Sequence, residues 1–245
     1  MVSETERRTM TYAQADAAEI DAGLRNYMLR VYNYMASGLL LSGIVAYVIA
    51  NTTLSNLFFQ VVEGRLGYTG LGFVAMLAPL GLIFFMSFTW QKRSATSLQF
   101  MYWLFVGLMG IGLSISLIAY TGASVTRVFF ITAASFSGLS LVGYTTKKNL
   151  SGMGTFLLMG LIGLIVASIV NVFLASSMMH FLISVIGVLI FAGLTVYDTQ
   201  RIKNTYFAVS GSGVEEHTAV MGAVALYLNF INLFHFLMML FGSRE

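Results

Sequence analysis

The sequence predicts an all-α integral membrane protein, folded as one bundle of seven transmembrane helices. Of its 245 residues, 58% are hydrophobic and 9% are charged, whereas an ordinary soluble domain carries about 25% charged residues. Several apolar runs are about 20 residues long, the length that a helix needs to cross roughly 30 Å of hydrocarbon. An unpaired backbone group is costly in lipid, so each run is expected to be helical.

The chain begins with a segment of mixed charge, residues 1–25, which we interpret as a cytoplasmic tail before a transmembrane domain over residues 26–245. No small-residue cleavage site precedes the first apolar run, so a cleaved signal peptide is not expected. The chain has no cysteine, which excludes disulfides and thiolate metal sites. Basic residues are confined to the tail and short loops, so the expected partner is the lipid bilayer and not nucleic acid.

Charged and turn-forming residues separate the apolar runs from one another. In chain order, the seven spans are expected at 28–50, 70–90, 98–120, 128–145, 153–174, 177–198 and 218–241. The fifth and sixth are separated by a short ASSMM segment, which favours a tight hairpin. The single proline, Pro79, lies inside the second span and is expected to kink it.

The basic residues predict the orientation of the bundle. Ten of them belong to one side: Arg7, Arg8, Arg25, Arg30, Lys92, Arg93, Lys147, Lys148, Arg201 and Lys203. The other side has three, Arg65, Arg127 and Arg244. By the positive-inside rule, the N-terminus is expected in the cytoplasm and, after seven spans, the C-terminus outside.

Three polar residues lie on one face of the seventh span. Asn229, Asn232 and His235 follow at steps of three residues and share about 120° of the helix circumference. We expect this face to point into the bundle, where the asparagines either join helices by hydrogen bonds or bind a ligand. His235 is expected to be neutral and hydrogen-bonded, because no second histidine has the spacing of a metal site.

Asp198 is an acid at the end of the predicted sixth span. A carboxylate removed from water must pair with a cation, bind an ion or take up a proton, so Asp198 is a candidate cation or proton site. The alternative is a solvated carboxylate held by Arg201, which lies at i+3 on a continuing helix. Tyr197, Gln200 and Arg201 are the polar residues expected to support the site.

Three segments, GLTVYDTQRIK, GYTTKKNLSGMG and ALYLNFINLF, resemble the signature segments of the Bax inhibitor-1 family, particularly its bacterial YccA-like branch, and the similarity runs from about Leu24 onward. The resemblance implies a seven-helix bundle with the last helix at its centre and a pH-sensitive calcium leak. It also implies two aspartates that face each other and a basic residue at the end of the second helix that pairs with the first of them, here called the latch. By motif, Asp198 is the first aspartate, and Lys92 or Arg93 is the latch.

The sequence departs from the family pattern at Asn229, where the motif has the second aspartate. Two adjacent carboxylates cannot both ionise readily, and asparagine removes that repulsion together with one negative charge. Calcium prefers several hard oxygen ligands, so Asp198 and one amide oxygen provide few ligands for a calcium ion. We hypothesise that Asp198 bonds Asn229, pairs with the latch and forms a gate with reduced pH sensitivity. Calcium is the expected transported ion, and no cofactor is expected.

Other classes of function remain as alternatives. An intramembrane aspartyl protease needs a second acid in a GxGD motif, which is missing, so the chain is not expected to be an enzyme. A membrane interaction protein that modulates an FtsH-type quality-control protease is the main rival, because that branch of the family is associated with such AAA proteases and residues 1–25 could serve as the contact. We expect a monomer or weak homo-oligomer in a bacterial inner membrane. No inverted repeat with broken helices supports a proton-coupled transporter.

Overall fold

Seven long helices form the protein. The computed structural model describes residues 4–62 and 65–243, with side chains from residue 21 onward except at 62 and 65. Within these residues, seven helices are long and apolar enough to cross a membrane. They are α1 (Glu4–Ala50), α3 (Gly70–Thr89), α4 (Ala95–Ala119), α5 (Gly122–Thr145), α6 (Ser151–Leu174), α7 (Ser177–Val209) and α8 (Glu215–Phe241). This confirms the predicted fold class.

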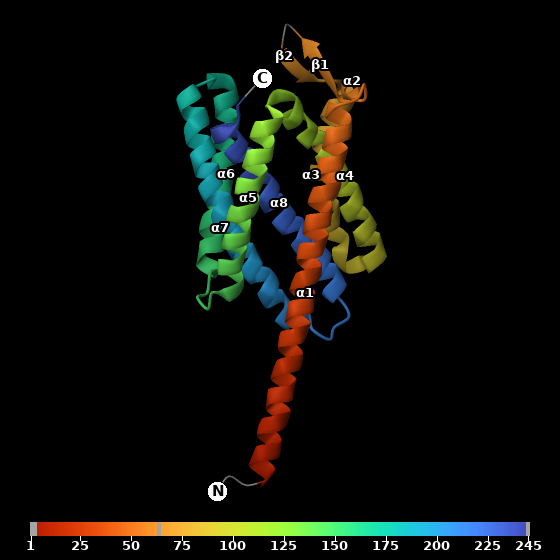
Figure 1. The fold of residues 1–245 in the computed structure, drawn as a ribbon, viewed down its shortest axis with the longest axis vertical. Helices are drawn as coiled ribbons and strands as arrows, with labels where there is room; N and C mark the ends of the chain where they lie inside the picture. The colour runs from red at the N-terminus through yellow and green to blue at the C-terminus, as the bar shows by residue number, and fades with distance from the viewer. Residues whose placement is uncertain (1–3, 63–64, 244–245) are drawn as a thin grey trace.

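Short elements connect the first two spans and end the second. A one-turn helix, α2 (Ser55–Phe58), precedes an antiparallel hairpin of β1 (Phe59–Val62) and β2 (Arg65–Tyr68), which the sequence analysis did not predict. A 3-10 turn, Trp90–Lys92, follows α3. The hairpin caps the end of the bundle opposite to the start of α1 (Figure 1).

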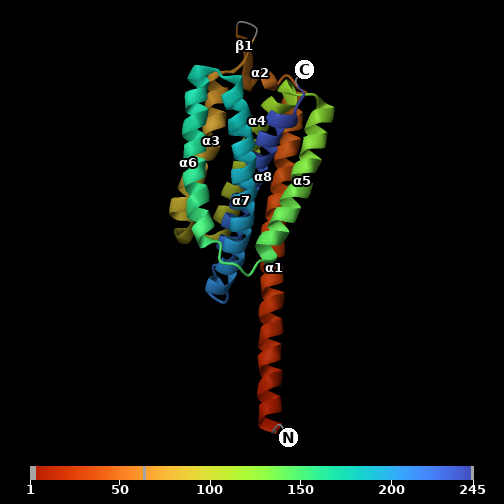
Figure 2. The same ribbon diagram turned by 90° about the vertical axis from the view of Figure 1, so that its left-hand side faces the viewer.

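Two helices continue well beyond the predicted spans. Helix α1 begins at Glu4, and its first turns project from the bundle (Figure 2). Helix α7 continues to Val209. Asp198 therefore lies inside a helix, whereas the hydropathy had predicted that the helix ends there. The polar segment after Asp198 therefore stays on α7, and residues at i+3 remain on the same face as Asp198.

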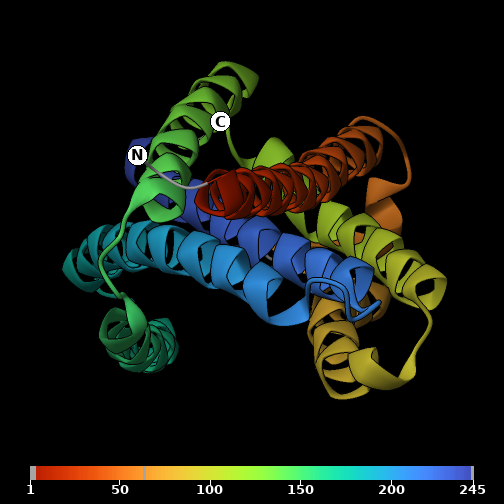
Figure 3. The same cartoon turned by 90° about the horizontal axis from the view of Figure 1, so that it is seen from below.

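Helix α8 forms the centre of the bundle, as the family resemblance implied. In its most apolar stretch, 56% of the residues are buried, against 11–33% in the other six spanning helices. Helices α1, α4, α5 and α7 all pack against it, and seen from below it runs between them (Figure 3). Helices α3 and α6 are peripheral, since α3 packs mainly on α4 and α6 on α7.

A glycine brings α5 and α7 close together. A Cβ atom at Gly143 would overlap the carbonyl oxygen of Val196 and lie 2.9 Å from Cβ of Thr199. Small residues of this kind let helix backbones approach each other in lipid. The contact fixes the position of Thr199, and therefore of its neighbour Asp198, along the axis of α5.

Candidate functional site

Asp198 is buried where α7 meets α8. The residue is 7% exposed, and its carboxylate has a partner on each oxygen. Asn229 Nδ2, from α8, donates to Oδ2 at 2.8 Å, and Arg201 Nη2 lies 2.8 Å from Oδ1. A buried carboxylate is expensive unless it is paired and hydrogen-bonded, and both conditions are met here. The structure thus brings together Asp198, Asn229 and Arg201.

A cavity of about 770 Å³ opens beside these residues. Peripheral helices α3 and α6 supply mostly apolar walls, including Ile83 and Leu161, with the hydroxyls of Thr155 and Ser168 on α6, while α7 and α8 supply the charged and amide groups of the lining. The polar lining residues on these two helices are Tyr197, Asp198, Arg201, Asn229 and Asn232. The site is therefore a small polar patch within a largely hydrocarbon-lined space.

A second cavity, of about 490 Å³, lies next to the first on the side of the α7–α8 loop. Its lining includes Trp90, Thr205 and Thr218, and it shares Ile83, Arg201, Ala225 and Leu228 with the larger cavity. Arg201 is thus the charged residue at the junction of the two cavities. Its side chain is 53% exposed, so the guanidinium bonds the buried carboxylate while remaining accessible.

The family assignment rests on the whole transmembrane part of the chain. The model of a family described as "Inhibitor of apoptosis-promoting Bax1" matches residues 24–245. The chain belongs to the Bax inhibitor-1 family. This Bax inhibitor-1 family member is similar to an uncharacterized protein of Caulobacter vibrioides, 49% identical over 236 residues with 94% of each chain covered. Another similar protein is the inner membrane protein YbhL of Escherichia coli, 41% identical over 228 residues, or 91% of this chain and 94% of that one. The protein is a multi-pass membrane protein.

The structure does not bring the family's expected latch to Asp198. Among the described residues, no hydrogen bond or ion pair joins Asp198 to Lys92 or Arg93. The Arg93 guanidinium lies over the ring of Phe85, 5.1 Å from its centroid, and the Arg93 carbonyl contacts His217 Nε2 at 2.8 Å. Helix α3 ends before these residues and packs on α4, so the position beside the carboxylate is filled by Arg201 from α7 itself.

Two of the supporting residues have distinct structural roles. The Arg201 guanidinium carbon lies 5.7 Å from the centroid of the Tyr197 ring, so this ring helps to orient the cation. Gln200 points away from the site: its Nε2 donates to the Lys148 carbonyl at 2.7 Å, and its Oε1 accepts from the Leu150 amide at 3.0 Å. Gln200 therefore fixes the loop between α5 and α6 and does not supply a ligand.

The predicted polar face of α8 divides into three different environments. Asn229 is buried against Asp198, and Asn232 lines the larger cavity while its Nδ2 donates to the Leu228 carbonyl. His235 is exposed, makes no hydrogen bond within the described residues and lines neither of the two cavities. It lies about 120° around the helix from Asn229, so the two side chains meet different surroundings. The expectation of an inward, hydrogen-bonded His235 was wrong.

A chain of hydroxyl groups leads from α1 to the residue next to Asp198. Tyr32 Oη lies 2.6 Å from Ser140 Oγ, and Ser140 Oγ lies 3.0 Å from Thr199 Oγ1, which donates to the Thr195 carbonyl. Ser140 belongs to the serine-rich apolar stretch of residues 128–145. The close approach of α5 and α7 at Gly143 brings the Ser140 hydroxyl to Thr199.

The site offers few ligands for a tightly held metal ion. No group of three His, Cys, Asp or Glu side chains that could hold a metal ion occurs within the described part of the chain. Both Asp198 oxygens already accept protein donors, and Asn229 can add one amide oxygen. Calcium takes six to eight oxygen ligands in stable sites. Asp198 and Asn229 therefore provide too few free oxygen atoms for a tightly held calcium ion.

Proposed function

We propose that the protein is a cation leak pathway of the bilayer, with calcium as the expected ion and a gate formed by Asp198, Asn229 and Arg201. The observation that supports this most is the one buried carboxylate among the described residues, which lines the larger cavity and is held by an amide and by a guanidinium that stands at the junction of the two cavities. A carboxylate inside a helix bundle is expensive to keep, and such groups in membranes mark ion or proton pathways.

The pair explains how the pathway is held closed. While Arg201 bonds Asp198, a positive charge stands at the junction of the cavities and repels an entering cation. When the pair separates, the carboxylate faces the cavity and attracts one. Because Asn229 does not titrate, one proton at most is exchanged at this gate. We therefore expect a shallower pH response than a gate of two coupled carboxylates gives.

Flux measurements on the purified protein in liposomes test the proposal. Calcium entry, followed with an enclosed indicator dye over a range of pH, is compared for wild type, Asp198→Asn and Asn229→Asp. We expect Asn229→Asp to steepen the pH dependence and Asp198→Asn to abolish it. Pathway and gate are both rejected if wild-type liposomes leak no faster than empty ones. The gate alone is rejected if both variants keep the wild-type pH profile.

A second function, modulation of a membrane-anchored AAA protease, is favoured by the shape of α1. Its first turns extend beyond the bundle as a continuous helix (Figures 1 and 2), where another protein can reach them. Deletion of residues 1–20 and Asp198→Asn separate the two functions. If the deletion alone changes turnover of the protease's substrates in cells, the tail carries that role independently of the gate.

A further inference from the structure

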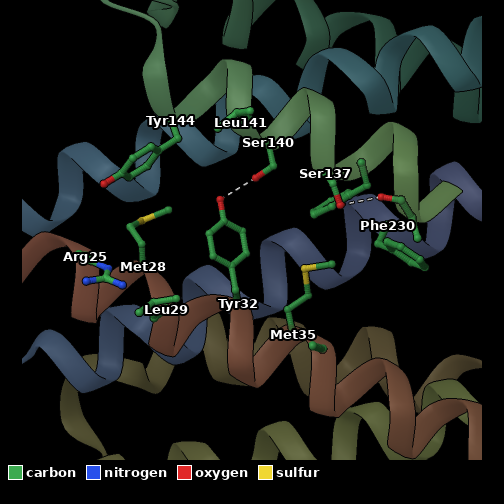
Figure 4. A pocket seen from close by; sticks show the side chains of 13 residues that line it. Arg25, Met28, Leu29, Tyr32, Met35, Ser137, Ser140, Leu141, Tyr144 and Phe230 are labelled. Atoms are coloured by element: carbon green, nitrogen blue, oxygen red, sulfur yellow. Dashed lines mark hydrogen bonds between the residues drawn. The ribbon is translucent and has the colours of Figure 1, made fainter.

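A groove between α1 and α5 lies on the opposite side of α8 from the gate. Both helices pack on α8, but between the two of them the described residues form one hydrogen bond, which joins the hydroxyl groups of Tyr32 and Ser140. The resulting groove has a volume of about 580 Å³ and is lined mostly by apolar side chains, with Phe230 of α8 at its base. Figure 4 shows Tyr32 bridging it, with Met28 and Met35 along the α1 wall.

The length of the groove matches one leaflet of a bilayer. Along α1 it runs from Arg25 to Ala36, and along α5 from Ala133 to Tyr144. Each is a step of 11 residues, or about 16 Å at 1.5 Å per residue. The hydrocarbon core of a bilayer is about 30 Å thick, so one leaflet is about 15 Å. The groove can thus take an acyl chain from the level of Arg25 to near the midplane.

Cations gather at one end of this groove. Arg25 and Tyr144 lie together at that end (Figure 4), and Tyr144 also lines a polar cavity of about 610 Å³ that contains Lys147, Lys148 and Lys203. Lys203 uses one of its three donors on the Tyr144 carbonyl, at 2.6 Å. In the described structure, Arg25 forms no ion pair, nor do Lys147 and Lys148, and no acidic side chain lines either cavity.

We propose that this groove binds an anionic phospholipid, with an acyl chain between α1 and α5 and the phosphate headgroup among Arg25, Lys147, Lys148 and Lys203. Any lipid chain can fill an apolar groove in a bilayer, so the charges decide the identity of the ligand. Four cations, with no acidic side chain lining either cavity, complement an anionic headgroup and not a zwitterionic one, and basic pockets between helices recognise such headgroups. This site is independent of the proposed gate.

Lipid retention by the purified protein tests the proposal. The full chain is reconstituted with phosphatidylglycerol and phosphatidylcholine, mildly delipidated, and analysed by native mass spectrometry. We expect wild type to retain phosphatidylglycerol in preference. In Arg25→Gln/Lys147→Gln/Lys148→Gln, that preference should fall by roughly fivefold for each charge removed. These three side chains form no ion pair in the described structure, so their removal is not expected to disturb folding.

Two further variants keep the result unambiguous. Lys92→Gln/Arg93→Gln removes charge from another loop at the same end of the bundle and should keep the wild-type preference. Ala36→Trp fills the groove from an exposed position and should lower retention of phosphatidylglycerol while every cation remains. The proposal is overturned if the triple variant retains phosphatidylglycerol like wild type, if the loop control loses it equally, or if Ala36→Trp has no effect.

Discussion

Replacement of Arg201 by glutamine tests whether Asp198 depends on its own helix for a counter-charge. The two groups lie 2.8 Å apart, and the side chains are 53% exposed for Arg201 and 10% exposed for Asp198. Removing one partner of a fully buried pair costs about 3–5 kcal/mol, whereas an exposed pair contributes about 0–1 kcal/mol. Only the carboxylate is buried here, and Asn229 keeps one hydrogen bond to it. We therefore expect Arg201→Gln to lower the free energy of unfolding by about 2 kcal/mol, between these limits.

A double-mutant cycle isolates the pair from other effects of the substitution. The free energy of unfolding is measured by titration with sodium dodecyl sulfate in mixed micelles, followed by circular dichroism, for Arg201→Gln, Asp198→Asn and the double variant. A neutral amide at 198 needs no cation, so the double variant should recover most of the loss, with a coupling energy of about 1–2 kcal/mol. Strictly additive effects would show that the guanidinium does not stabilise the carboxylate.

Three other substitutions follow from the same contacts. Gln200→Leu removes the bonds that hold the α5–α6 loop, and we expect a loss of about 2 kcal/mol by the same titration, at about 1 kcal/mol for each bond, together with faster proteolysis of that loop. Gly143→Leu should prevent α5 from meeting α7 and remove the monodisperse peak in size-exclusion chromatography, whereas Gly138→Leu, which has open space beside it, should keep it. Lys92→Gln/Arg93→Gln should leave calcium flux in liposomes unchanged while Arg201→Gln raises it; the reverse result would assign the latch to the end of α3.

The sequence was sufficient to predict the helices that span the bilayer. Apolar runs predicted all seven spans, because a lipid-exposed helix must be apolar along its length. It was insufficient where a polar residue has a partner distant in the chain. Helix α7 passes its predicted end because Gln200 and Lys203 bond carbonyls near the end of α5, which hydropathy does not register. The β1–β2 hairpin lies outside the spans, and its pairing left no comparable signal.

At the site, helix periodicity and the family motif each predicted one of the two partners of Asp198. The motif placed the counter-charge on Lys92 or Arg93, whereas the i+3 spacing had also offered Arg201, which is the residue that the structure pairs with Asp198. The family motif predicted the Asp198–Asn229 contact, and the periodicity of α8 did not give the direction of His235. A shared arc of about 120° is wide enough for its two edges to face different neighbours.

In the proposed gate, the two partners of Asp198 respond to different movements. A cation on another helix is withdrawn when that helix slides, but Arg201 is one turn from Asp198 on α7, so a rigid movement of α7 carries both together. Asn229 comes from α8, and a relative tilt of α7 and α8 removes its hydrogen bond. The two helices are joined by the short turn at 210–214, where Gly211 and Gly213 take left-handed backbone angles, and Asp198 lies about 18 Å along α7 from this turn. A tilt of about 5° at the turn shifts the contact by roughly 1.6 Å, enough to break a hydrogen bond. Movement of α8, the helix that α1, α4 and α5 also touch, therefore acts on the Asn229 bond, whereas separation of the Arg201–Asp198 pair in the proposed gate requires the Arg201 side chain to rotate away.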